Sequence, residues 1–168
     1  MKNLLFIFVS LILINCKNKS TIKNDSIIGM EFQNYKQITQ LKNYTKVSDT
    51  SIYENNIEPQ YKILHLQDKS NNLIVFKSMT PDSIGNLTFK ILDTLIIPNS
   101  KKSEFITIGY CYSDNGKDEN IIAIVDKTDS LRIQNIKQVW KANTDLKIIE
   151  KANNLSGINC FNEFFVQK

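Results

Sequence analysis

The sequence predicts a mainly β domain, an antiparallel meander that forms a sandwich or a partly closed barrel. Three observations support this class. Beyond residue 60 the chain contains repeated short apolar runs rich in β-branched residues, which strands favour. Polar turn sequences such as Asp114-Asn115-Gly116 separate these runs at hairpin spacing. The composition, with 42% hydrophobic and 23% charged residues, is ordinary for one folded domain.

Eight strands are expected in order along this part of the chain. They are Tyr61–Gln67, Leu73–Ser78, Leu87–Ile97, Phe105–Tyr112, Ile121–Asp126, Leu131–Lys141, Leu146–Lys151 and Ile158–Phe165. Short strands with hairpin-length breaks favour antiparallel pairing. Because eight strands must hide their edges, a sandwich or a partly closed barrel is expected rather than one flat sheet.

The alternation of apolar residues indicates how three of these strands are buried. In Leu87–Ile97 the apolar residues occupy alternate positions except at Asp93, as in a strand with one covered face. Ile121–Val125 is apolar throughout, which indicates a central strand covered on both faces. In Leu131–Lys141 the apolar phase changes, and a β-bulge near Asn135 is expected to cause the change.

The segment before residue 60 is less regular. Apolar and aromatic side chains recur there at every third position: Phe32, Tyr35, Ile38, Leu41 and Tyr44. This spacing could mark one stripe of an amphipathic helix within Ile27–Val47. Such an N-terminal helix would cover one face of the sheet and would make the domain α+β. Ser48–Pro59 is expected to form a loop.

The first 16 residues differ from the rest of the chain. Lys2 precedes a largely apolar run, Leu4–Ile14, and polarity resumes after Cys16. A helix of this length spans about 16 Å, whereas a bilayer core is about 30 Å thick. The run is therefore too short for a permanent membrane anchor, and its length fits the apolar core of a signal peptide.

The end of this run, Leu13-Ile14-Asn15-Cys16, resembles the lipobox of bacterial lipoproteins, in which an aliphatic residue stands three positions before an obligatory cysteine. Asn15 departs from the Gly, Ala or Ser that this family prefers there. The resemblance implies lipidation of Cys16 by acyl chains such as palmitate. Two alternatives remain: Cys16 could end an ordinary signal peptide, or the run could be a buried N-terminal strand of a cytosolic protein.

The resemblance also implies a division of the chain. Residues 1–15 would be a signal peptide, residues 16–26 a lipidated tether, and residues 27–168 a single β-rich globular domain. The protein would then lie in the cell envelope, anchored to a membrane by lipid on its periplasmic or outer-membrane face. Two or more acyl chains anchor a protein stably, whereas one binds weakly.

Two further cysteines remain once Cys16 is assigned to lipid. Cys111 and Cys160 each lie within an expected strand, and an exported domain folds in an oxidising compartment. A disulfide between them would close a loop of about 50 residues and contribute about 4 kcal/mol in the chain-entropy description. The alternative is two buried free thiols, which pack like small apolar residues.

Few residues could support catalysis or metal binding. His65 is the only histidine, and no nucleophile motif accompanies it. The spacings C-x-x-C and H-x-x-x-H are absent, and Asp114–Glu119 lacks the spacing of an EF-hand loop and is expected to form a hairpin turn. Five scattered glycines provide no phosphate-binding loop. The sequence therefore predicts a protein that is not an enzyme and needs no metal or cofactor.

The charge pattern bears on the partners. The formal charge is +4, but acidic and basic residues are interleaved, and the longest basic run is Lys101-Lys102. Nucleic-acid-binding proteins usually cluster Arg and Lys on one face. The sequence therefore predicts no nucleic-acid partner. A membrane, reached through the N-terminal lipid, and a protein are the partners expected.

Aromatic residues near the C-terminus are the remaining signal. Six could meet if the last strands pair: Tyr110, Tyr112, Trp140, Phe161, Phe164 and Phe165. Such a cluster could be core or a recognition face. The first functional hypothesis is a cell-envelope lipoprotein with a non-enzymatic binding or structural role. The alternative is a small inhibitor or immunity-type protein that neutralises a toxic partner at the membrane. A hydrolase is disfavoured by the single histidine.

Overall fold

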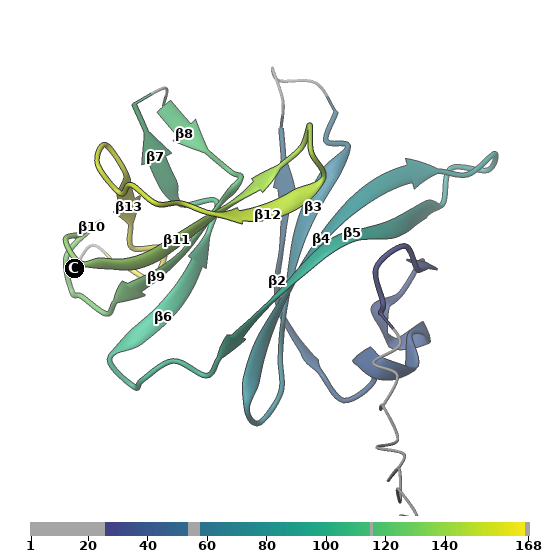
Figure 1. The fold of residues 1–168 in the computed structure, drawn as a ribbon, viewed down its shortest axis with the longest axis horizontal. Coiled ribbons are helices and arrows are strands. Elements are labelled where there is room, and N and C mark those ends of the chain that lie inside the picture. The colour runs from purple at the N-terminus through teal and green to yellow at the C-terminus, as the bar shows by residue number, and fades with distance from the viewer. Residues whose placement is uncertain (1–25, 54–57, 115, 167–168) are drawn as a thin grey trace, which may run out of the picture.

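A computed structural model describes residues 26–53, 58–114 and 116–166 and confirms a mainly β protein (Figure 1). The strands form three sheets whose pairings are all antiparallel, and none of these sheets closes into a barrel within the described residues. The signal peptide, the lipidation site Cys16 and most of the tether lie outside the described residues, so those predictions stay predictions.

Sheet A contains the first five strands in the order β1-β5-β4-β3-β2. Their bounds are β1 Glu31–Phe32, β2 Thr45–Ile52, β3 Tyr61–Gln67, β4 Asn71–Pro81 and β5 Leu87–Pro98. β3 has the bounds expected from the sequence, and β4 and β5 include their expected ranges.

The strand β2 corrects the expectation of a loop at Ser48–Pro59. Its sequence contains few apolar residues because β2 is the edge strand of sheet A and much of it faces solvent. Lys46 and Asp49 add charge to this edge, and the register with β3 shifts between Lys46 and Ser48. Charges and bulges of this kind discourage edge-to-edge pairing with another chain.

The helix that the spacing suggested is absent from Ile27–Val47. Two short 3₁₀ turns, η1 (Tyr35–Gln37) and η2 (Thr39–Leu41), form there instead. A strict three-residue repeat matches the 3₁₀ geometry of three residues per turn better than the α-helical 3.6. Ile38 and Leu41 are buried, so the stripe does cover one face of sheet A as expected.

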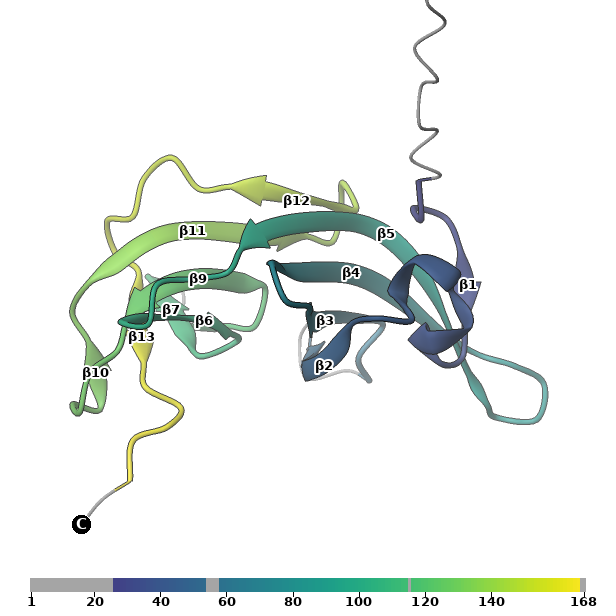
Figure 2. The ribbon, with the colours of Figure 1, turned by 90° about the horizontal axis from the view of Figure 1, so that it is seen from below.

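Sheets B and C contain the remaining strands, and the chain passes back and forth between the two sheets from β6 to β13 (Figures 1 and 2). Sheet B has the order β12-β11-β9-β6, and sheet C has the order β10-β13-β7-β8. Sheet B consists of β6 Glu104–Ile108, β9 Ile121–Asp126, β11 Ile136–Asn143 and β12 Ile148–Lys151. Sheet C consists of β7 Cys111–Ser113, β8 Gly116–Asp118, β10 Arg132–Ile133 and β13 Asn159–Phe161.

Two of the expected strands are each divided because the chain changes sheets. Phe105–Tyr112 divides at Gly109, whose φ of 77° ends β6 and directs the chain into sheet C. Leu131–Lys141 divides after Ile133, where the chain leaves sheet C for sheet B. The bulge expected near Asn135 is found close by, as a register shift between Ile136 and Gln138.

Three apolar clusters hold the layers together. The first joins sheets A and B, with Phe76 and Trp140 as large members. The second lies between sheet A and the N-terminal turns, and the third between sheets B and C. Ile122 of β9 faces the first cluster and Ala123 the third, which confirms the prediction of a central strand covered on both faces.

Candidate functional site

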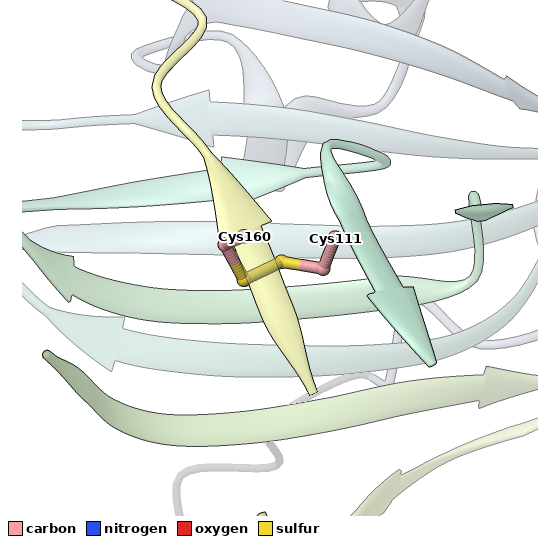
Figure 3. Close-up of a disulfide and its surroundings, with 2 residues drawn as sticks. All are labelled: Cys111 and Cys160. Carbon is pink, nitrogen blue, oxygen red and sulfur yellow. A yellow bond between two sulfur atoms is a disulfide. The ribbon is translucent and has the colours of Figure 1, made fainter. Parts of the chain in front are cut away.

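A disulfide joins the two central strands of sheet C (Figure 3). Cys111 on β7 and Cys160 on β13 are directly opposite in the antiparallel register, with an S–S distance of 2.02 Å. Both side chains are buried against sheet B in the third cluster. The predicted bridge is therefore present, and it fixes β7 beside β13.

The opposite face of sheet C carries a row of aromatic and cationic side chains. Successive residues of a strand point to opposite faces, so Tyr112 and Phe161, which follow the two cysteines, face away from sheet B. Arg132 of β10 is the register partner of Phe161, and Lys117 of β8 is the partner of Tyr112. The order across the four strands is cation, ring, ring, cation, and we call these four residues the ring face.

Three members of the ring face are in contact, and the face is partly open to solvent. The rings of Tyr112 and Phe161 meet edge to face, with centroids 5.0 Å apart, and the guanidinium carbon of Arg132 lies 5.8 Å from the Phe161 centroid. Tyr112 is 38% exposed, and Arg132 and Lys117 are exposed. Lys117 makes a surface ion pair of 3.0 Å with Glu119.

The six aromatic residues expected to meet are divided among three places. Trp140 belongs to the core between sheets A and B. Tyr110, 44% exposed, is beside the ring face, because its carbonyl accepts a hydrogen bond from the Phe161 N–H. Phe164 and Phe165 line a hollow beyond β13. The prediction of one cluster is thus correct only for the residues around Phe161.

The hollow near the C-terminus has a volume of about 930 Å³ and opens to solvent. We call it the C-terminal hollow; its lining consists of Phe105, Lys127, Thr128, Asp129, Asn162, Phe164, Phe165 and Val166. Phe105 and Phe164 meet edge to face with centroids 5.4 Å apart. Phe164 is nevertheless 69% exposed, and Val166 is 79% exposed.

Asn162 organises the walls of the C-terminal hollow. Its buried side-chain amide donates to the carbonyl of Thr128 at 2.7 Å, which ties the tail to the loop after β9. Its side-chain oxygen accepts from the Phe164 N–H, and its backbone carbonyl accepts from the Phe165 N–H. A buried amide satisfied on both sides gives the hollow a defined shape.

The lining of the hollow is half apolar and half polar, and the polar half includes one cation, Lys127, and one carboxylate, Asp129. Pockets for small ligands typically measure about 300–1,000 Å³ and are lined mainly by apolar side chains, with a small number of polar groups that orient the ligand. Lys127 makes no ion pair with another described residue, so its ammonium group can meet an anionic group of a ligand. Neither Lys127 nor Asn162 was singled out by the sequence, where nothing marks them apart from other polar residues.

His65 is part of a buried polar network on sheet A. Its Nε2 lies 2.9 Å from Oδ1 of Asn72, whose amide donates to Oδ1 of Asn99 at 3.1 Å. The acceptor role of Asn72 assigns the proton to Nε2 of a neutral imidazole. Burial lowers the pKa of His65, and the hydrogen bond to Asn72 opposes this shift only in part. These contacts describe a structural histidine.

A second buried charge lies on the face of sheet A that the N-terminal turns cover. The Lys77 side chain is 2% exposed; its Nζ is 3.2 Å from Oδ2 of Asp49 and 3.9 Å from the centroid of the Phe89 ring. Burial lowers the pKa of Lys77, and the charge of Asp49 opposes the shift. Oδ1 of Asp49 is buried and has no hydrogen-bond partner among the described residues. Lys77 is enclosed by the fold, whereas the side chain of Asp49 is 25% exposed.

Two absences in the described part of the chain concern metal ions and membranes. The described residues contain no group of three or more His, Cys, Asp or Glu side chains that could hold a metal ion. No helix in this part of the chain is long and apolar enough to cross a bilayer. Comparison of the chain with known protein families, with curated proteins and with solved structures finds no match.

Proposed function

We propose that this protein is an exported, lipid-anchored domain with a non-enzymatic binding role, and that the C-terminal hollow receives a small ligand with an apolar body. The observation that carries the binding role is the exposure of Phe164 and Val166 on the wall of a hollow that Asn162 holds in shape. Exposed apolar side chains gathered around a concavity mark binding sites more often than scattered ones do.

Two features support the cell-envelope address. The lipobox-like sequence ending at Cys16 implies export and lipid attachment. The Cys111–Cys160 disulfide is of the kind that persists in oxidising compartments and is rare in the cytosol. An anchored domain needs only to hold its ligand near the membrane, which requires no catalytic residues.

The binding role is tested with anilinonaphthalene sulfonate, a fluorescent probe that has an apolar ring system and one negative charge. Titration of the whole chain should give saturable binding. Phe164→Ser should weaken it by about tenfold, the equivalent of roughly 1.4 kcal/mol, because an apolar wall is removed. Ile84→Ser is the matched control, since Ile84 is 82% exposed on a distant turn. Equal affinity of the two variants for the probe would contradict the assignment to the hollow.

The address is tested by growing the producing cells with labelled palmitate. The wild-type protein should carry the label and fractionate with membranes, and Cys16→Ser should lose both properties. A full-length, unlabelled wild-type protein in the cytosol would contradict export and lipid attachment. It would not change the measured affinity of the hollow for its probe.

A further inference from the structure

The ring face is a second surface with a definite chemical order, separate from the C-terminal hollow. Arg132 and Lys117 stand on the two edge strands of sheet C, and Phe161 and Tyr112 stand on the two central strands. Four neighbouring strands span about 14 Å at the usual spacing of 4.7–4.9 Å. The register partner of Tyr112 is Asn159, so Tyr112 and Phe161 lie diagonally across the two central strands, between the two cationic residues.

The fold holds this row firmly. The disulfide lies directly beneath the two rings, because Cys111 precedes Tyr112 and Cys160 precedes Phe161. Arg132 is the only arginine in the chain, and it forms no ion pair with another described residue. Lys117 is half exposed and its partner Glu119 is 20% exposed, so an incoming anion would share or replace this pair at the exposed ammonium group.

We propose that the ring face binds a linear acidic glycan. Sugar rings would lie over Phe161 and Tyr112, whose aromatic surfaces contact the C–H groups of the sugars. Acidic groups on either side would reach the two cations, and the planar guanidinium of Arg132 suits a carboxylate in two-point contact. A neutral glycan would leave both cations without partners and should bind weakly.

One observation and one consideration favour a glycan over a single-stranded nucleic acid. Successive bases stack on the flat faces of aromatic side chains. The rings of Phe161 and Tyr112 are inclined at 62°, so the pair does not present one continuous flat platform for stacked bases, and each ring would contact a different sugar of a glycan. The consideration rests on the proposed function: an exported domain meets polysaccharides outside the cytosol, and acidic glycans match the sign of the ring face.

The test is electrophoresis of the whole chain through native gels that contain polygalacturonate, uncharged dextran or single-stranded poly(dT). Polygalacturonate should retard the protein and dextran should not. Arg132→Gln and Lys117→Gln should each weaken retardation by about tenfold. Lys90→Gln is the matched control. Lys90 is an exposed lysine on β5, so this substitution removes the same charge at a site outside the ring face.

Phe161→Leu separates stacking from charge, since it keeps an apolar side chain and removes the ring. It should also weaken retardation, and an intact disulfide by mass spectrometry should confirm that sheet C is formed. An equal loss in Lys90→Gln would show binding by net charge alone and would overturn the proposal. Retardation by poly(dT) but not by polygalacturonate would overturn it in favour of a nucleic acid.

These measurements are independent of the proposed function. Arg132→Gln leaves the C-terminal hollow intact and should bind anilinonaphthalene sulfonate as the wild type does. A failure of palmitate labelling would not change retardation by polygalacturonate in a gel. The two proposals can therefore fail separately.

Discussion

The carboxylate of Asp93 on β5 accepts a hydrogen bond of 2.7 Å from the backbone N–H of Ile149 on β12, 56 residues later in the chain. The second oxygen of Asp93 accepts from the N–H of Thr94. Asp93 is the one polar residue in the apolar alternation of β5, and its register partner Phe76 belongs to the core between sheets A and B. A carboxylate thus joins the two sheets at a point where no backbone ladder connects them.

Asp93→Ala should destabilise the protein by about 1–3 kcal/mol, because the N–H of Ile149 would lose its partner in a half-buried position. Urea denaturation would measure the change in the free energy of unfolding. Asp145→Ala is the matched control, an exposed aspartate of the β11–β12 turn whose carboxylate has no hydrogen bond to another described residue. Unchanged hydrogen exchange of the Ile149 amide in Asp93→Ala would show that this bond does not hold the sheets together.

The two partners of the Lys77–Asp49 ion pair should differ in how much their removal destabilises the protein. Asp49→Ala should cost about 2–4 kcal/mol, because it leaves a buried ammonium group unpaired; the partial exposure of Asp49 places the cost toward the lower end. Lys77→Met should cost less, since a thioether fills the same space against Phe89.

The double variant Asp49→Ala/Lys77→Met distinguishes this account from simple loss of packing. With both charges gone, no buried ion remains, and the double variant should be more stable than Asp49→Ala alone. The free energy of unfolding in urea would measure the difference. A double variant that is less stable than either single variant would contradict the account.

His65 should make the protein sensitive to mild acid. Burial lowers the pKa of His65 in the folded state below its usual value of about 6.5, so the unfolded state binds the proton more readily. The contribution of the neutral His65 to the free energy of unfolding is therefore fully present above pH 6.5. It is lost as the pH falls from 6.5 toward the lowered pKa of the folded state. Urea midpoints at pH 7.5 and pH 5.5 would show the fall.

His65→Gln is the control for this pH dependence. A glutamine can still donate to Asn72 but does not titrate, so the variant should lose most of the change between pH 7.5 and pH 5.5. Because the chain has one histidine, the comparison isolates a single group. If wild type and variant lose the same stability over this range, other groups must be responsible.

Loss of the disulfide should lower the free energy of unfolding by about 4 kcal/mol, the chain-entropy value for a loop of this length. The comparison is between wild type and Cys111→Ala/Cys160→Ala in urea without reductant. Dithiothreitol should lower the midpoint of the wild type and leave that of the variant unchanged. A wild-type mass that corresponds to two free thiols under non-reducing conditions would contradict the bridge.

The sequence was most informative where a strand is buried. β3 and β9 have the expected bounds because each is a compact apolar run with polar turns beside it. β2 was missed because an edge strand that faces solvent has no apolar run, and the property that hides it from pattern analysis is the property that protects the edge. The spacing of the N-terminal stripe is compatible with an amphipathic helix, and the structure has two 3₁₀ turns there instead.

The candidate sites were harder to predict for a different reason. Hydrophobic alternation shows which residues share a face of one strand, but it does not say which sheet the strand joins. The ring face depends on β10 and β13 being partners although 25 residues separate Ile133 from Asn159. The disulfide could be anticipated because only Cys111 and Cys160 remain once Cys16 is assigned to lipid, whereas Arg132 and Lys117 each had many conceivable neighbours.

Sheet C also constrains the order in which the protein can be assembled. β13 lies in its interior, between β10 and β7, yet it comes last in the chain among the described strands. The segments that precede β13 include every strand of sheets A and B, but they cannot complete sheet C. Cys160, the disulfide partner of Cys111, lies 49 residues later in the chain. Sheet C therefore stays incomplete until the last described strand has been added, and the disulfide can close only at that stage.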